Sequence, residues 1–521
     1  MNIDSFLAHH RLKQNPFAAE EARLDPVFEQ LRESGAQHPD FGKIMGRIDQ
    51  PATAVVFGEK GSGKTAIRLE IERLANSHNK SSPSAKTFVV AYDDLNPVLD
   101  RLMRERRQDA ETMLDHLRLE DHQDAILSLG VTRLVTALLE GESDLPLPDN
   151  PKRTLRRLPK ETRRDFATLA MLYDTPASGA PTERLGSLRR KLRLGRGVPL
   201  QGLFVAACLF TLLAVISGLV VRFMDPARLG DTRIWWIIGF VVTALAATGL
   251  WAGFLALTYR FWRRAKLIKK EMPATNRSRE ELRFMFTQLS KATLEGQPVP
   301  EASAARPDDD TAGDDRYRLT RKFLDVLKGL GYGGLLVLVD RMDEPTAIQG
   351  DADRMRRLVW PMMDNKFLKQ DHVGLKLLLP VELSYLLGKE SSDFYREARL
   401  DKQALVERLE WSGSTLYDLC SARLNAVRDR KHKGVESEAA GRMSLTDLFE
   451  DDVNREMLID ALDQMHQPRD AFKFMYEVVQ EHCSLVPEEA ASFEIARLTL
   501  ETVRRNQSQR VQELYRGLKP A

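Results

Sequence analysis

The residues best suited to chemistry lie in a glycine-rich run, Gly58-Glu-Lys-Gly-Ser-Gly-Lys-Thr65. An apolar, β-branched stretch at 53–57 precedes this run, and a helical pattern of apolar residues follows it. In this setting glycines let backbone N–H groups turn toward a phosphate, Lys64 reaches the outer phosphate oxygens, and the Thr65 hydroxyl can bind Mg²⁺. A solvated glycine-rich turn, the alternative, would need neither the strand nor the helix. The expected phosphate contacts are Gly58, Glu59, Lys60, Gly61, Ser62, Gly63, Lys64 and Thr65.

The run is a complete Walker A motif, which needs a carboxylate at the end of a second buried strand. The strongest candidate strand is Leu-Leu-Val-Leu-Val at 335–339, which leads into Asp340-Arg-Met-Asp-Glu344. Asp340 would hold magnesium through water, and Asp343 or Glu344 would polarise the attacking water. A buried strand with a solvated acidic turn is the alternative for this segment taken alone. The two segments together predict ATP and Mg²⁺ as ligands.

Two apolar stretches lie between these motifs. Residues 197–221 and 234–259 contain 25 and 26 residues without a charge, whereas about 20 suffice to span hydrocarbon. They predict a transmembrane hairpin embedded in lipid; buried core helices are the alternative, but these would contain polar breaks. Neither span has an ionisable residue, which indicates an anchor rather than a transport path. Gly249 and Gly253 form a GxxxG pair that can pack within the hairpin or against a second copy.

The charges beside the spans predict their orientation. The connecting segment carries Arg222, Arg228 and Arg233, partly offset by Asp225 and Asp231. Cations are denser on both outer flanks, so the positive-inside rule places both flanks in the cytoplasm and predicts a multi-pass protein of a cell inner membrane. The flanking cations are Arg184, Arg189, Arg190, Lys191, Arg193 and Arg196 before the first span, and Arg260, Arg263, Arg264, Lys266, Lys269 and Lys270 after the second.

Composition narrows the remaining classes of function and cellular location. The 77 Lys and Arg residues nearly balance 75 Asp and Glu, for a net charge of +2, so no global basic field indicates nucleic acid. Cys208, Cys420 and Cys483 are too scattered for a zinc cluster and too few for a disulfide framework, which is consistent with a reducing compartment. Residues 1–17 lack the apolar run and cleavage site of a signal peptide, so we expect the N-terminal part not to be exported.

The motifs and the inserted hairpin resemble a known class. The spacing Asp340-x-hydrophobic-Asp343-Glu344 is similar to the STAND class of P-loop NTPases, especially its NACHT branch, and to the acidic run of KAP-type NTPases. KAP proteins also carry membrane helices between Walker A and Walker B. The resemblance implies an α/β fold, an AAA-like parallel sheet with a C-terminal helical lid, and roles in regulation, stress or antiphage defence. Those families usually have a small or acidic residue where Arg341 stands, and this departure weighs against brisk hydrolysis.

Three further positions follow from the resemblance. Residues 373–380 form a plausible core strand where AAA-like chains place sensor 1, with no evident polar sensor after it. Arg396 and Arg399 precede a candidate strand at 406–411, the neighbourhood of an arginine finger in AAA+ relatives; a charged helix surface is the alternative. Arg469 opens a predicted helix and is similar to a sensor 2 arginine, with a surface helix terminus as the alternative. The catalytic candidates are Asp343, Glu344 and Arg399.

The elements that position these residues form a discontinuous core. A strand is predicted at 87–92, followed by Asp93 and Asp94, which are expected to form a turn or, as the alternative, to reach the nucleotide site. A disordered linker is predicted at 297–315 and a last helix at 490–514. We expect a bracing segment (1–50), the first part of the P-loop NTPase core (51–98), a helical basic cytoplasmic insertion (99–196), the hairpin (197–262), a cytoplasmic helix and acidic linker (263–315), the second part of the core (316–411) and a helical lid (412–521).

The function favoured by these features is a membrane-anchored, ATP-dependent regulatory or signalling switch, with a second copy or another protein as its partner. The alternative is a membrane-tethered, DNA-associated ATPase of the origin or partition type, which would use the basic run 423–433. A solvated helix end is the plainer interpretation of that run. Two uncharged spans and the lack of a Leu-Ser-Gly-Gly signature disfavour a pump.

Overall fold

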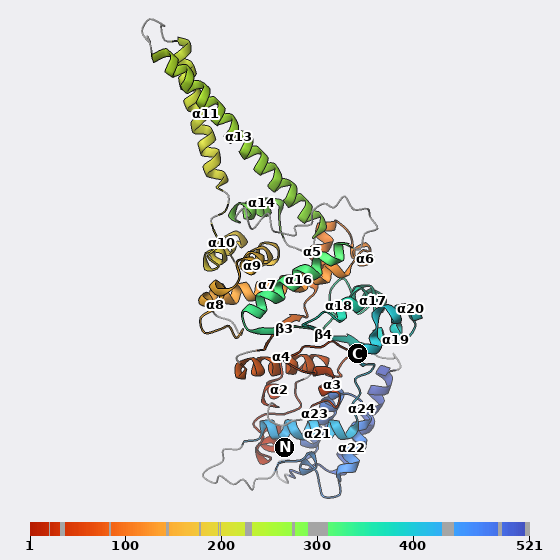
Figure 1. Ribbon diagram of the computed structural model, residues 1–521. Coiled ribbons are helices and arrows are strands. Elements are labelled where there is room, and N and C mark those ends of the chain that lie inside the picture. The colour runs from red at the N-terminus through yellow and green to blue at the C-terminus, as the bar shows by residue number, and fades with distance from the viewer. Residues whose placement is uncertain are drawn as a thin grey trace. The chain divides into compact units, whose positions relative to one another are not determined.

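The chain divides into two compact units (Figure 1), each described by itself below. The first unit consists of Met1–Ser81, Ala91–Asp94 and Leu336–Ala521, and the second of Ser82–Val90 and Leu95–Leu335. The computed structural model describes residues 1–19, 21–31, 37–82, 85–141, 145–176, 179–195, 197, 199–223, 232–272, 277–289, 311–429, 442–487 and 492–515.

Five strands form one parallel sheet in the order β2-β3-β4-β1-β5. Strand β1 pairs with both β4 and β5, so that Val56 lies opposite Leu378 and Val406. Val, Leu and Phe dominate β1, β3 and β4, and nearly every side chain in them is buried, as is typical of parallel strands covered on both faces. The strands are β1 (Ala54–Gly58), β2 (Lys86–Tyr92), β3 (Tyr332–Val339), β4 (Val373–Pro380) and β5 (Ala404–Val406).

Four of the five predicted strands are confirmed to within a few residues, and the fifth is displaced. The strand predicted at 406–411 ends at Val406 instead. Glu407, Arg408 and Glu410 are exposed, and charged side chains of this kind do not extend a buried strand. The backbone N–H of Leu409 still donates to the Phe57 carbonyl at 2.8 Å, so this segment stays beside the end of β1.

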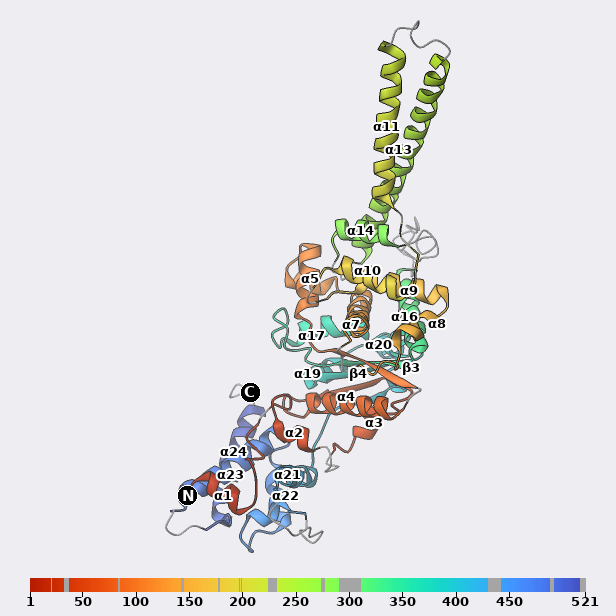
Figure 2. The ribbon, with the colours of Figure 1, turned by 90° about the vertical axis from the view of Figure 1, so that its left-hand side faces the viewer.

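Helices surround the sheet and form a separate core in the first unit (Figure 2). Phe6 and Phe17 from the N-terminal segment share that core with Leu416 and Phe474, so much of residues 1–31 packs on the C-terminal helices. The helices are α1 (Ile3–His9), α2 (Pro26–Gln30), α3 (Phe41–Met45), α4 (Lys64–Ser81), α17 (Ala352–Val359), α18 (Asn365–Leu368), α19 (Val381–Leu387), α20 (Ser392–Ala398), α21 (Gly413–Val427), α22 (Arg455–Asp463), α23 (Pro468–Leu485) and α24 (Arg497–Tyr515), with 3-10 turns η2 (Trp360–Met362), η3 (Leu400–Lys402) and η4 (Leu445–Leu448).

The C-terminal part of this unit corrects two expectations. The last helix begins at Arg497 rather than 490, because Ile495 pairs with Phe449 in an isolated β-bridge. Arg423, the first residue of the basic run 423–433, is 2% exposed and donates to Asp25 at 2.6 Å. It cannot serve an exposed DNA-binding surface. Arg430, Lys431 and Lys433 lie outside the described residues.

The second unit is a helical bundle held partly by buried ion pairs. Arg316 donates to Asp124 at 3.3 Å, and the Tyr173 hydroxyl donates to the same carboxyl at 2.7 Å. These residues join three helices, α7, α9 and α16. The helices of this unit are α5 (Asn96–Arg106), α6 (Ala110–Asp115), α7 (Leu119–Glu140), α8 (Pro151–Arg157), α9 (Lys160–Tyr173), α10 (Pro181–Lys191), α11 (Leu200–Phe223), α13 (Thr232–Glu271), α14 (Arg279–Gln288) and α16 (Thr311–Gly329).

The linker prediction fails at its C-terminal end. Residues 311–315 belong to the first turns of α16, where Asp315 pairs with Arg318 one turn later. Acidic residues are also favourable near a helix N-terminus. The rest of the predicted linker, residues 297–310, lies outside the described residues.

Two helices of the second unit are long and apolar enough to cross a membrane. They are α11 and α13, which run side by side (Figures 1 and 2) and contact through Trp251, whose indole N–H donates to Thr211 at 3.1 Å. In their most apolar windows only 17% and 6% of the residues are buried, whereas a soluble core helix would be mostly covered. Side chains added at Gly249 and Gly253 would meet open space, so this pair does not pack the hairpin. Arg228, Asp225 and Asp231 of the connecting segment, and Arg196, lie outside the described residues.

Candidate functional site

The glycine-rich loop runs from the end of β1 into α4 at the carboxyl edge of the sheet. Gly61 and Gly63 have φ of 101° and 94°, a region that favours glycine. A Cβ at Gly58 would lie 2.5 Å from the Ser62 hydroxyl oxygen, and one at Gly61 would lie 2.9 Å from Gln467 Oε1. Conformation therefore favours glycine at Gly61 and Gly63, and a side chain at Gly58 or Gly61 would also displace Ser62 or Gln467.

Lys64 begins α4 and extends along the loop. Its ammonium group donates to the carbonyls of Gly58 at 2.6 Å and Glu59 at 2.9 Å. Burial lowers the pKa of Lys64, and the negative charges of Asp343, Asp340 and Glu382 oppose that lowering. The cation thus faces three carboxylates across the cavity, held by carbonyls that an incoming anion could replace.

Thr65 and Asp340 meet at this edge although 275 positions separate them in sequence. The Thr65 hydroxyl donates to Asp340 Oδ2 at 2.9 Å. Asp340 is 1% exposed, and burial raises its pKa, against the hydrogen bond from Thr65 and the charge of Arg68. A hydroxyl and a carboxylate side by side are ligands of the type that Mg²⁺ takes together with phosphate oxygens. The donor set therefore fits that ion.

Asp340 also belongs to a charge network that sequence reasoning missed. Arg68, one turn after Thr65, places its Nε 3.5 Å from Asp340 Oδ2 and its Nη2 3.4 Å from Asp93 Oδ2. Arg23 of the N-terminal segment donates to the same Asp93 carboxyl. Asp93, for which a turn after β2 was the favoured prediction, instead links this segment to Asp340 through Arg68. We call Thr65, Arg68, Asp93 and Asp340 the edge cluster.

The acidic turn after β3 begins with an unusual backbone. Arg341 adopts φ of 60°, uncommon for a residue with a side chain. Its guanidinium donates to Glu344 at 3.1 Å. Burial raises the pKa of Glu344, and Arg341 counteracts this shift. Asp343 and Glu344 both line the cavity, but Glu344 is half exposed and engaged by Arg341.

The C-terminal helices supply the opposite wall. The backbone N–H of Arg469 donates to the Gly61 carbonyl at 3.4 Å, and its side chain lines the cavity. Glu59 accepts hydrogen bonds from Arg408, at 2.5 Å, and from Gln467. The first turn of α23 is therefore fastened to the loop by both backbone and side-chain contacts.

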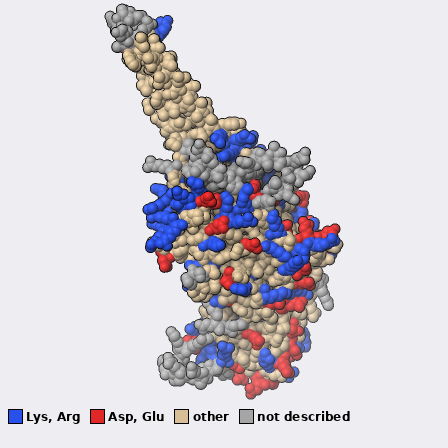
Figure 3. All heavy atoms as spheres, viewed as in Figure 1, with Lys and Arg blue, Asp and Glu red and all other residues tan. Residues whose placement is uncertain are grey.

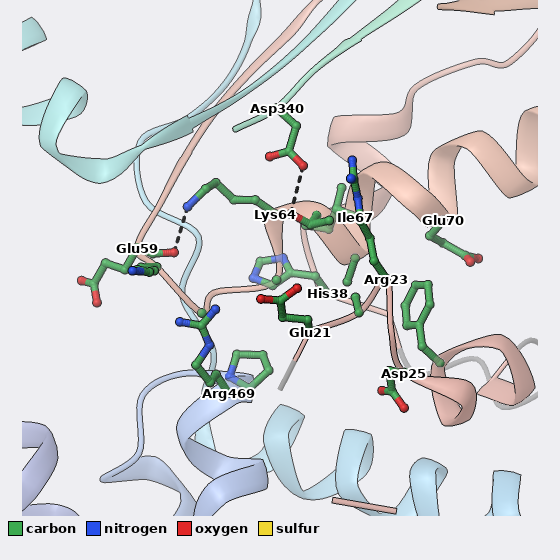
Figure 4. Close-up of a pocket in the computed structure, with 18 of the residues that line it drawn as sticks. Glu21, Arg23, Asp25, His38, Glu59, Lys64, Ile67, Glu70, Asp340 and Arg469 are labelled. Carbon is green, nitrogen blue, oxygen red and sulfur yellow. Dashed lines mark hydrogen bonds between the residues drawn. The ribbon is translucent and has the colours of Figure 1, made fainter. Parts of the chain in front are cut away.

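The cavity between these elements has a volume of about 490 Å³, which suits a small molecule. Its charged end contains Lys64, Asp340 and Arg469, as Figure 4 shows, and Glu382 from the first turn of α19 also lines it. Glu382 follows β4, where the sequence offered no obvious polar sensor. The cavity is also lined by the apolar residues Phe28, Leu31, Phe41, Leu419 and Phe472.

Among the residues expected at the site, Arg399 stands apart. It ends α20 in a left-handed conformation, does not line the cavity, and pairs with Asp401 at 3.4 Å. Arg396 is likewise engaged on the surface, with Asp393 at 2.8 Å. Lys60 lines the cavity mouth and is exposed. The other expected residues cluster around the loop, while Arg68 and Glu382 were not anticipated and Asp93 was expected mainly to form a turn.

Fold and site together define a mixed α/β protein with a five-stranded parallel sheet, a cavity at its carboxyl edge and two helices long enough to cross a membrane. Comparison with protein-family models, curated proteins and solved structures finds no match. The functional argument therefore rests on the residues of this chain.

Proposed function

We propose that the chain is a membrane-anchored P-loop NTPase that binds ATP with Mg²⁺ and acts as a slow, nucleotide-dependent regulatory switch. The observation that carries the proposal is the hydrogen bond between Thr65 and Asp340. It joins the two segments that resemble Walker A and Walker B, beside Lys64. Resemblance to KAP and STAND proteins, including a role in stress or antiphage defence, belongs to this proposal.

Each residue has a defined task in this scheme. The loop backbone and Lys64 bind the phosphates, with Lys64 exchanging its loop carbonyls for phosphate oxygens. Thr65 and Asp340 hold Mg²⁺, which screens the charge that develops on the phosphates. Arg469 adds a cation from α23, so bound triphosphate would pull the C-terminal helices toward the loop.

Slow turnover follows from the acidic turn. Glu344 can act as general base only when its carboxylate is free to accept a proton from water, but Arg341 holds it at 3.1 Å. Asp343 and Glu382, whose charges act on Lys64, also line the cavity. A chain that binds tightly and hydrolyses slowly remains in one state for long periods, as a switch requires.

The hairpin supplies the membrane anchor in this proposal. The two long apolar helices and the cations on their flanks support insertion with the N- and C-terminal parts in the cytoplasm of a cell with an inner membrane. The nucleotide state of the chain would be transmitted through its assembly with a second copy or another protein.

Hydrolysis by the detergent-solubilised chain tests the catalytic part. We expect slow release of phosphate, a loss of about 100-fold in Asp340→Ala, and a similar loss in only one of Asp343→Asn, Glu344→Gln and Glu382→Gln, which identifies the base. Equal rates in the native chain and Asp340→Ala would rule out catalysis at this site.

A further inference from the structure

The base of the hairpin carries an unusual set of exposed side chains. Helix α13 continues without a break from its apolar part into a basic segment, where Arg260, Arg263, Lys266 and Lys270 are exposed. Figure 3 shows Lys and Arg side chains gathered directly below the uncharged surface of the hairpin. The opposite face of the same segment is buried, including Phe261.

Helix α14 fixes this basic segment to the body of the second unit. The rings of Phe286 in α14 and Phe261 in α13 stack with centroids 5.8 Å apart. The other arm of the hairpin meets the same helix, because a Cβ at Gly197 would lie 1.8 Å from the Thr287 carbonyl oxygen. Arg189 of α10 donates to the Gln288 carbonyl at 2.9 Å. Both arms thus converge on α14.

The outer face of α14 combines cations with an aromatic ring. Leu282, Met285 and Phe286 are buried, whereas Arg279 and Arg283 are exposed and Phe284 is 50% exposed. Acidic groups offset part of this charge: Glu280 is exposed beside Arg279, Glu281 caps its own helix, and Glu105 pairs with Lys269 at 3.0 Å. The exposed cations of α13 next to an exposed aromatic ring on α14 are typical of a membrane interface.

Helix geometry sets the depth of these cations. The 26 uncharged residues at 234–259 extend for about 39 Å at about 1.5 Å per residue, whereas hydrocarbon is about 30 Å thick. Arg260 would therefore emerge among the lipid headgroups. Lys270 lies about 15 Å further along the helix, and the Debye length is about 8 Å. The surface charge of a bilayer therefore acts on the nearer cations most strongly.

We propose that the hairpin base, defined as Arg260, Arg263, Lys266 and Lys270 of α13 with Arg279, Arg283 and Phe284 of α14, binds the headgroups of anionic phospholipids. The basic segment continues directly from the apolar part of α13, so it lies at the headgroup layer once α13 spans the membrane. This position favours lipid over nucleic acid as the ligand. Since α14 contacts both arms, lipid charge can influence the second unit. The inference rests on the proposed membrane insertion.

The test uses the full chain in bilayers of phosphatidylcholine with trace spin-labelled phosphatidylcholine or phosphatidylglycerol, and measures the fraction of each label immobilised by the protein. We expect phosphatidylglycerol to be preferred about threefold, and the preference to fall toward one in high salt. The preference for phosphatidylglycerol should be lost in a quadruple variant of α13, Arg260→Gln, Arg263→Gln, Lys266→Gln and Lys270→Gln. It should be weakened in a double variant of α14, Arg279→Gln and Arg283→Gln.

A matched control neutralises four cations of α8, Lys152, Arg153, Arg156 and Arg157, which lies farther from the hairpin than α14 in Figures 1 and 2. This control should retain the preference. An inserted chain without lipid preference, or a preference that survives the quadruple change, would overturn the inference and leave insertion intact. Release of the chain from the bilayer by alkaline carbonate would overturn both the lipid inference and the proposed membrane insertion. Stronger displacement by duplex DNA than by added phosphatidylglycerol would assign the surface to nucleic acid instead.

Discussion

Two buried ionic clusters in this chain look alike but differ in what surrounds them. In the edge cluster, Arg68 lies 3.5 Å from Asp340; in the second unit, Arg316 lies 3.3 Å from Asp124. Burial raises the pKa of both carboxyls. Asp340 opens onto a cavity beside a glycine-rich loop, whereas Asp124 is enclosed by three helices. A buried charge pair therefore indicates a ligand site only when a cavity and further ligands adjoin it.

The enclosed cluster of Asp124, Tyr173 and Arg316 should have the largest effect on the free energy of unfolding. Arg316→Met leaves the Asp124 carboxyl buried without its cation, and breaking such a pair costs about 3–5 kcal/mol. We expect a lower unfolding midpoint for the second unit, measured by denaturant titration of the solubilised chain. Arg318→Met, on the exposed side of the same helix, is the matched control and should change stability little. Equal effects of the two changes would contradict a structural role for the enclosed pair.

The same cluster should give stability a pH dependence. The pKa of Asp124 is raised to about 6, against about 3.9 in an unfolded chain. Between these values the folded state keeps a proton that the unfolded state has released, so stability falls as pH rises from about 4 to 6, by up to about 3 kcal/mol from this group. Asp124→Asn should remove that fall, whereas Asp165→Asn on α9 should not. A pH profile of unfolding that is identical in native protein and Asp124→Asn would refute the assignment.

The edge cluster should instead control ligand binding. The charge of Arg68 opposes the rise that burial causes in the pKa of Asp340, and so favours the ionised carboxylate. In Arg68→Ala we expect Mg²⁺-dependent ATP binding to weaken about tenfold at pH 6 and less at pH 8, because protons compete more strongly for Asp340 at lower pH, with Arg68→Lys intermediate. Titration calorimetry at both pH values measures this. Tighter Mg²⁺ binding in Arg68→Ala at every pH would mean that Arg68 competes with the metal.

The smallest expected effect is on the rate of hydrolysis, from a change at Arg341 in the turn after β3. Arg341→Gly relieves the positive φ and releases Glu344, so hydrolysis should accelerate a few-fold without a change in ATP affinity. Single-turnover phosphate release separates the two quantities. An unchanged rate would show that Glu344 is not limited by Arg341 and would leave Asp343 or Glu382 as the base.

Sequence patterns predicted the parts of the molecule that are local. The strand, loop and helix around Gly58–Thr65, the strand before Asp340 and the two apolar helices each follow from short-range order. The pairing of Asp93 with Arg68 could not be found this way, because a turn carboxylate and a charged helix position look the same in sequence whether they are solvated or buried. Glu382 was missed for a similar reason. Glu382 reaches the cavity because β4, which precedes it, lies beside β1 in the sheet. That strand order is a property of the whole sheet and cannot be inferred from one segment.

The central claim is that this edge binds ATP through Lys64. Calorimetric titration of the detergent-solubilised chain with ATP and Mg²⁺ tests it most directly, with Lys64→Ala compared against Lys80→Ala, an exposed lysine near the other end of the same helix. The account predicts binding by the native chain and Lys80→Ala, and affinity at least about 100-fold weaker in Lys64→Ala. Equal affinity in Lys64→Ala, or no binding by the native chain, would contradict it.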